Sequence, residues 1–215
     1  MDDQNFADGF PRVALAATGA AEVQADVLAV PVAAGGEPDA AVQALGETVA
    51  GFVASGEHRG RLRDRLLVPG TDGMAARRVL LYGLGARRDL DGQRLRFAHQ
   101  EMVRAARGYG HRRVAVLRAG PLRDEDAGAV VEGCVAGGWD RRHRATADRQ
   151  APLDELTLVG FHGVEPGAID LARRLGAATA RAREWQNTPA NEMGPQTLAD
   201  IAAEMAGRLG LELEV

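Results

Sequence analysis

Residues 26–32 read DVLAVPV, and this short, almost wholly apolar stretch decides the fold class. A run of this length suits a strand that is covered on both faces, as strands of parallel or mixed sheets are. Residues 79–85, VLLYGLG, have the same character and end in a glycine turn. Both runs therefore predict strands in the interior of a sheet.

Shorter strand and helix patterns alternate around these two runs. Further strands are predicted over residues 13–16, 113–117 and 156–161. Helices are predicted over residues 39–54, 91–109 (capped by Asp91) and 124–135, with exposed polar stretches at residues 1–10 and 140–149. This alternation is typical of an α/β domain, in which a mostly parallel or mixed sheet lies between two layers of helices.

Two further helical patterns follow near the C-terminal end. The first places a set of apolar residues on one helix face: Leu171, Leu175, Ala178, Ala182 and Trp185. The second does the same with Leu198, Ile201, Met205 and Leu209. The last residues, 210–215, alternate as GLELEV and predict a strand, so we expect a longer protein that has been cut at a domain boundary.

The break between these helices has a physical cause. Pro189 lacks an N–H and disfavours helical backbone at the preceding residue, so it ends the first helix. Pro195 suits the first position of the next helix, where a donor would have no partner. Asn187 and Asn191 are able to hydrogen-bond to nearby backbone and hold a tight connection.

Composition excludes several classes of protein. The net charge is −4, which gives no overall attraction to nucleic acid or to anionic membranes. Cys134 is the one cysteine, and no apolar run is long enough to be a membrane span or signal peptide. We therefore expect a cytoplasmic protein. All 26 basic residues are arginine, because the sequence contains no lysine.

The break also carries a resemblance to a known family. Residues 187–193, NTPANEM, followed by Pro195 and by Leu198-Ala199, are similar to the interdomain signature of the leucyl aminopeptidase (cytosol aminopeptidase) family. Residues 26–36, 79–85 and 131–140 resemble other segments of its N-terminal domain, in the same order. The sequence departs from the family pattern at Gly194, where threonine is common, and at Asn187, a position that varies in the family.

The resemblance implies a domain plan and a function. Residues 1–165 would form a macro-domain-like α/β domain, 166–194 a linker helix with its loop, and 195–215 the start of a truncated peptidase domain. The full-length protein would be a hexameric exopeptidase that releases N-terminal amino acids from peptides. Its two divalent metal ions, zinc or manganese, would lie in the C-terminal catalytic domain.

This chain is accordingly expected to hold no catalytic, cofactor or metal residue. The family uses a lysine as a metal ligand, and this chain has none. Its linker signature residues are assigned a structural role: Asn187, Pro189, Asn191 and Pro195. The domain would contribute to hexamer assembly and to active-site access, with the catalytic domain as its partner.

Other chemistry has weaker support in the sequence. Gly83-x-Gly85 lacks the third glycine of a nucleotide-binding turn, which favours an ordinary strand–helix turn. The five histidines lack metal-ligand spacing: His58, His99, His111, His143 and His162. Cys134 lies on an apolar helix face, which is typical of a buried residue rather than a nucleophile.

Two alternatives remain open. A macro-like module would bind ADP-ribose beside Asp26 and Gly35-Gly36, although residues 32–34 replace the expected asparagines. A DNA-binding module would use the arginine clusters at residues 59–65, 77–78, 87–88 and 141–144. We expect no membrane partner and regard nucleic acid as the weaker possibility.

Overall fold

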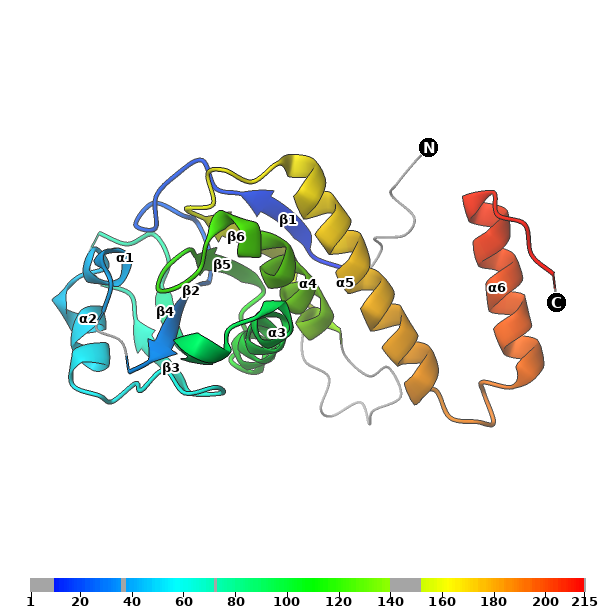
Figure 1. Cartoon of the computed structure of the whole chain (residues 1–215), viewed down its shortest axis with the longest axis horizontal. Helices are drawn as coiled ribbons and strands as arrows, with labels where there is room; N and C mark the ends of the chain where they lie inside the picture. The colour runs from blue at the N-terminus through cyan, green and yellow to red at the C-terminus, as the bar shows by residue number, and fades with distance from the viewer. Residues whose placement is uncertain (1–9, 36–37, 72, 140–151, 215) are drawn as a thin grey trace.

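The computed structural model describes residues 10–35, 38–71, 73–139 and 152–214. Of the stretches expected to be exposed, residues 1–10 and 140–149, all but Phe10 lie outside these ranges, and Phe10 is half-buried against the larger core. Six strands form one sheet: β1 (Arg12–Leu15), β2 (Val27–Ala34), β3 (Arg65–Pro69), β4 (Arg78–Ala86), β5 (Arg113–Leu117) and β6 (Glu155–Val159). Their order across the sheet is β1-β6-β5-β2-β4-β3 (Figure 1).

Every neighbouring pair of strands is parallel except the antiparallel pair of β3 and β4. The two runs that decided the fold class, β2 and β4, lie side by side in the interior of the sheet. Alternate residues along these strands point into two separate cores. In β4, Leu80 and Tyr82 face one core, whereas Val79 and Leu81 face the other. The prediction of a mostly parallel sheet between helices is therefore confirmed.

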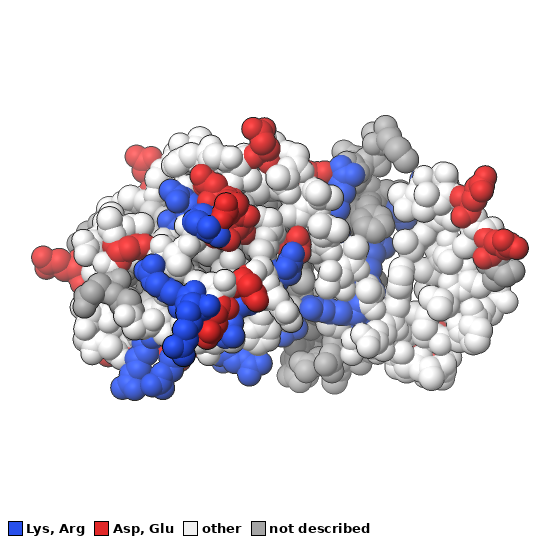
Figure 2. Space-filling model, in the orientation of Figure 1, with Lys and Arg blue, Asp and Glu red and all other residues white. Residues whose placement is uncertain are grey.

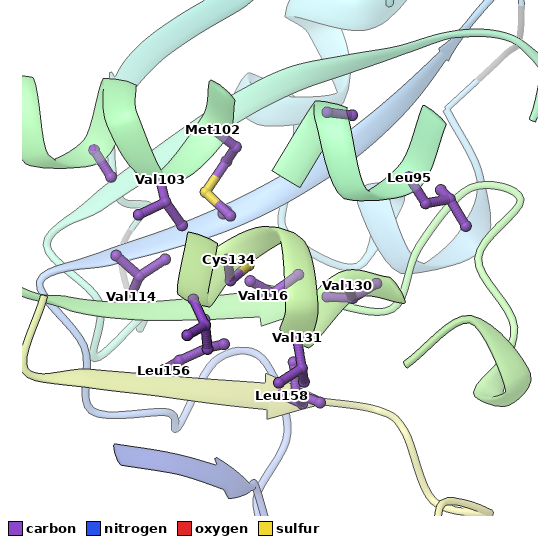
Figure 3. Close-up of a cluster of buried hydrophobic side chains, with 14 of the residues drawn as sticks. Leu95, Met102, Val103, Val114, Val116, Val130, Val131, Cys134, Leu156 and Leu158 are labelled. Atoms are coloured by element: carbon purple, nitrogen blue, oxygen red, sulfur yellow. The ribbon is translucent and has the colours of Figure 1, made fainter. Parts of the chain in front are cut away.

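Helices cover both faces of the sheet. One face carries α1 (Ala40–Gln43) and α2 (Glu47–Ala54), whose Val42 and Val49 enter the smaller core. The other face carries α3 (Gly92–Gly108), α4 (Ala127–Gly138) and α5 (Pro166–Asn187). Figure 3 shows side chains of α3 and α4 meeting those of β5 and β6 in the larger core.

Several predicted boundaries are corrected. Residues 39–54 form two helices instead of one, because Gly46 adopts φ 101°, a conformation that interrupts a helix and suits only glycine. The helix predicted over residues 124–135 opens as a 3₁₀ turn, η3 (Asp124–Asp126), before α4 begins. Strand β3, which begins at the last residue of the arginine cluster at 59–65, has no counterpart among the predicted strands.

The prediction of a strand at the C-terminal end is also wrong. Helix α6 (Pro195–Leu209) ends at Gly210, which has φ 65°, and residues 211–214 after it are exposed and form neither strand nor helix. A strand needs a neighbour to satisfy its backbone groups, and no neighbouring strand lies beside these residues in the described part of the chain. Within the same ranges, no helix combines the length and apolar character needed to cross a membrane.

Candidate interdomain interface

Helix α5 is attached to the α/β domain through its inner face. Ile169, Ala172 and Ala180 are buried, and Gly176 lies so close to α4 that a Cβ there would stand 2.8 Å from Cβ of Val135. Two side-chain hydrogen bonds hold the second half of the helix: Trp139 Nε1 donates to Glu184 (2.7 Å), and Arg183 donates to Gln100 (2.8 Å).

The outer face of α5 corrects the sequence interpretation. The stripe of apolar residues at three- and four-residue steps does not face the domain: Leu171 is 57% exposed and Leu175 is 47% exposed. Ala178 and Ala182 are exposed as well. Small residues make the inner contact instead, because α4 approaches too closely for leucine. The periodicity thus identified a face that has no partner among the described residues.

The linker loop after α5 is built from local hydrogen bonds. Asn187 Nδ2 donates to the carbonyl of Arg183 (2.6 Å), and Thr188 Oγ1 donates to that of Glu184 (2.8 Å). The backbone amides of Glu192 and Met193 both donate to the carbonyl of Pro189 (2.9 Å each), which forms a tight turn. Side chains on the helix and backbone in the loop therefore fix the chain direction.

The remaining two signature residues differ in what they contact. Pro195 occupies the first turn of α6, as expected, with Gly194 as the N-cap. Asn191 is exposed, and its side chain makes no hydrogen bond within the described ranges. Of the two asparagines, Asn187 alone makes a side-chain hydrogen bond here, and that bond lies within the last turn of α5.

Helix α6 stands apart from the sheet and its covering helices (Figure 1). Ala206 is its one buried residue in the described structure, and it lies next to the returning tail, where Leu211 N–H donates to its carbonyl. The large apolar side chains of the helix and tail are exposed: Leu198 49%, Leu209 37%, Leu211 62% and Leu213 44%. An amphipathic helix with these exposures lacks the surface against which such helices normally pack.

Gly83 and Gly85 lie within β4, not in the turn that the sequence predicted at this place, and other protein segments cover them. The amide of Gly85 donates to the carbonyl of Gly60, and that of Gly83 donates to Asp64 (2.9 Å each). A Cβ at Gly83 would lie 1.7 Å from the carbonyl oxygen of Arg61. These glycines therefore allow residues 60–64 to cross the end of the strand, and their amides are not available for a phosphate group.

Asp26 is likewise engaged within the chain. One carboxylate oxygen accepts the backbone amides of Arg112 and Arg113 (2.9 Å each), and the other accepts the Arg113 guanidinium (2.9 and 3.1 Å). Burial acts to raise the pKa of Asp26, but these bonds outweigh it and hold the pKa below its ordinary value. The ADP-ribose alternative thus finds its aspartate occupied at the start of β2, and Gly36 lies outside the described residues.

The histidines and the cysteine lie at separate places. His99 is buried, and its Nδ1 donates to Leu95 O (2.7 Å) while its Nε2 accepts from the Tyr82 hydroxyl (2.8 Å). Cys134 is buried in the larger core, where burial raises the pKa of its thiol. Within the described ranges, which omit His143, no three His, Cys, Asp or Glu side chains come together as a metal site.

The arginine clusters are exposed but mixed with acidic residues. Figure 2 shows basic side chains gathered over the part of the surface where β3 and η2 (Arg87–Asp89) lie, with acidic side chains between them. Arg63, for example, lies 3.6 Å from Glu101 and over the ring of Phe97. The cluster at residues 141–144 lies outside the described residues. A continuous basic stripe is therefore not established.

Comparisons with known proteins connect this architecture to a family. Residues 29–144, just over half of the chain, match the model of the cytosol aminopeptidase family, N-terminal domain. A probable cytosol aminopeptidase of Solibacter usitatus is 31% identical over 195 residues, which cover 90% of this chain and 39% of that protein. One from Microcystis aeruginosa is 30% identical over 174 residues, with coverages of 80% and 35%. The chain thus spans well under half the length of these curated relatives.

Solved structures agree on the fold. A mutant of tomato leucine aminopeptidase superposes with a TM-score of 0.74 at 22% identity, covering 93% of this chain and 43% of that one. The bottromycin maturation enzyme BotP gives a TM-score of 0.62 at 28% identity, with coverages of 87% and 38%. Because the family model spans most of the sheet and its two helix layers, the chain belongs to the cytosol aminopeptidase family and contains its N-terminal domain.

Proposed function

We propose that this chain is the non-catalytic N-terminal domain of a leucyl aminopeptidase that removes N-terminal amino acids from peptides in the cytoplasm. The match of residues 29–144 to the N-terminal domain of the family carries the proposal. The much greater length of the relatives supports it, because it leaves room for a catalytic domain that this chain does not contain.

The residues that the structure describes do not fit a catalytic metal centre. The described residues bring no cluster of ligands together, and the sequence has no lysine to serve as the family's ligand. A pair of divalent ions, zinc or manganese, would supply an activated water and polarise the scissile carbonyl. Under this proposal those ions belong to the catalytic domain, and no step of the reaction runs through this chain.

The contribution of this chain is then structural. The outer face of α5 and the apolar side of α6 would pack against the catalytic domain, which would cover Leu171, Leu175 and Leu198. Contiguous exposed apolar surface of this kind commonly marks an interface. The loop 188–194 between them would set the angle between the two domains. As the family resemblance implies, the domain would also contribute to hexamer assembly and to access to the active sites.

An activity assay tests the proposal directly. The 215-residue chain and the longest protein encoded by its reading frame are supplied with Zn²⁺ or Mn²⁺ and a leucine chromogenic substrate. We expect turnover by the longer protein alone, and light scattering should give the mass of its hexamer. Turnover by the 215-residue chain would refute the non-catalytic role. A reading frame without a catalytic domain would refute the aminopeptidase role, and ADP-ribose and DNA titrations would then be decisive.

Paired substitutions test the docking face. Leu171→Gln with Leu175→Gln places amides on the outer face of α5, and Leu171→Met with Leu175→Met is the matched control, because it changes the same two side chains but keeps them apolar. In the longer protein we expect the glutamine pair to lower the melting temperature and the hexamer fraction, while the methionine pair has little effect. In the 215-residue chain both changes should be nearly neutral. An equal response of both proteins would contradict docking at this face.

A further inference from the structure

A polar cavity lies at the amino ends of three neighbouring strands. It has a volume of about 490 Å³, which falls in the range of small-molecule sites. The segments before β2, β4 and β5 line it, with Gln24, Asp26, Arg77, Arg78, His111 and Arg113 as the polar residues. It lies at the opposite end of these parallel strands from Gly83 and Gly85, and it shares Asp26 with the site considered for ADP-ribose.

The side chains that line this cavity carry more positive than negative charge. Arg113 is paired with Asp26, whose two oxygens accept four hydrogen bonds in all. Arg77 and Arg78 are exposed, and within the described ranges neither has an acidic partner. Two guanidinium groups therefore remain to attract an anion, and each presents a planar fork of donors that matches the oxygens of phosphate.

His111 supplies a third group. The turn at Gly110, which has φ 83°, ends α3 and places His111 at the cavity, with its amide donating to the carbonyl of Ala106 (3.0 Å). Its Nε2 is shielded from solvent and lacks a hydrogen-bond partner among the described residues. A buried polar atom without a partner is unfavourable, so a turn of the imidazole ring toward the cavity would expose this nitrogen and let it pair with a ligand oxygen.

The walls of the cavity are held in place before any ligand arrives. The amide of Asp26 donates to the carbonyl of Arg113 (2.9 Å), and that of Ala75 donates to Ala21 (2.7 Å). The carbonyl of Arg77 accepts from Gly70 (3.0 Å). These bonds fix the three lining segments relative to one another, which lowers the entropic cost of binding.

We propose that this cavity binds the phosphate group of a small phosphorylated molecule through Arg77, Arg78 and His111, with the Asp26–Arg113 pair as its fixed wall. A phosphate monoester carries close to two negative charges and three acceptor oxygens, which match two guanidinium groups and one imidazole. A single carboxylate would leave one guanidinium without a partner. The cavity has room for more than the phosphate group, so the rest of the ligand would lie in its outer part.

Calorimetric titration of the 215-residue chain tests this site, with inorganic phosphate and then pyrophosphate as probes at low ionic strength. We expect saturable binding of one anion per chain. The double change Arg77→Gln and Arg78→Gln should weaken it by at least ~10-fold, because two charge-assisted contacts are lost. His111→Gln should weaken it less.

The other end of β4 offers a matched control. Arg87 and Arg88 are also adjacent and exposed, so Arg87→Gln with Arg88→Gln removes the same charge at a distance from the cavity. We expect this pair to keep the affinity within about twofold, as an effect of net charge alone would be small. Equal losses from the two pairs, or no saturable binding by the unaltered chain, would overturn the proposal. Neither result depends on aminopeptidase activity, so the proposed function is tested separately.

Discussion

The α/β domain buries its large apolar side chains, whereas the segment from α5 to the C-terminal tail exposes most of them. In the domain, Leu28, Leu80 and Leu156 are completely buried between sheet and helices. Seven large apolar residues in the described structure are exposed, and six of them lie in or after α5. Tyr109, at the end of α3, is the exception. The domain therefore covers its apolar positions with its own helices and strands, whereas the apolar positions of the later segment remain exposed to solvent.

This difference shows what a helical stripe does and does not determine. Periodicity in α5 and α6 identifies a face that favours burial, but it leaves open which surface covers that face. In α5 the domain takes the opposite face, through small residues such as Ala172 and Gly176. The leucines of the outer face are left exposed and available to contact another surface. Three measurements would sharpen the comparison or break it.

The largest contrast is expected between two leucines. Leu158 is fully buried in β6, so Leu158→Ala should reduce the free energy of unfolding by ~2–5 kcal/mol. Leu198 is 49% exposed on α6, so Leu198→Ala should change it by less than ~0.5 kcal/mol. Urea unfolding followed by circular dichroism measures both. A large cost at Leu198 would show that α6 packs on this domain in solution and would remove the distinction.

Acid should act on the domain through His99. Burial lowers the pKa of His99 to about 4, from 6.5 in the unfolded chain, so between these values the unfolded state binds the extra proton. Stability should therefore fall as the pH drops from about 6.5 to about 4, by ~3 kcal/mol for this group. His58 and His111 also have lowered pKa values, because of burial, and add to the same pH window.

A variant separates the contribution of His99 from the others. His99→Gln should be less stable at neutral pH, because the Tyr82 and Leu95 contacts are disturbed, yet its stability should depend less steeply on pH. Residues 166–214 contain no histidine, so this effect belongs to the domain alone. Denaturant midpoints measured from pH 4 to pH 7 for both proteins give the comparison. Identical slopes would mean that His99 is not buried as a neutral group.

The smallest effects should come from two glycines in the two helices. Gly176 faces α4, so Gly176→Ala should cost ~1–3 kcal/mol of stability. Gly207 on α6 has open space around its Cβ position, so Gly207→Ala should favour the helix by ~0.5–1 kcal/mol. Far-ultraviolet circular dichroism and melting temperature report these opposite signs. A loss at Gly207 would indicate a close neighbour for α6.

Much of the fold could be read from particular stretches. The buried runs of β2 and β4, the strand at β5 and the helix capped by Asp91 stand where the sequence predicted them. The predictions were wrong where contacts between distant segments determine the local structure. The break at Gly46 is stabilised by Thr71, whose hydroxyl donates to the carbonyl of Leu45 (3.0 Å) from a distant loop. The strand predicted after Gly210 found no neighbour in the described structure.

The candidate sites divide in the same way. Asn187 and Pro195 took the positions that their local chemistry predicts, since capping and proline geometry act within a few residues. The cavity beside Arg77 and His111 could not be anticipated. Its lining residues are far apart in the chain, and only the order of the strands brings their amino ends together.

The sequence by itself determined the class of fold, the two apolar faces near the C-terminal end and the place where the linker turns, because periodicity, capping and proline geometry are local. The tertiary structure decided which face of α5 is buried, that the amides of the two glycines in β4 are already hydrogen-bonded, and which charges gather at the start of β2. These outcomes depend on the distances between segments that are remote in sequence, and folding alone sets those distances.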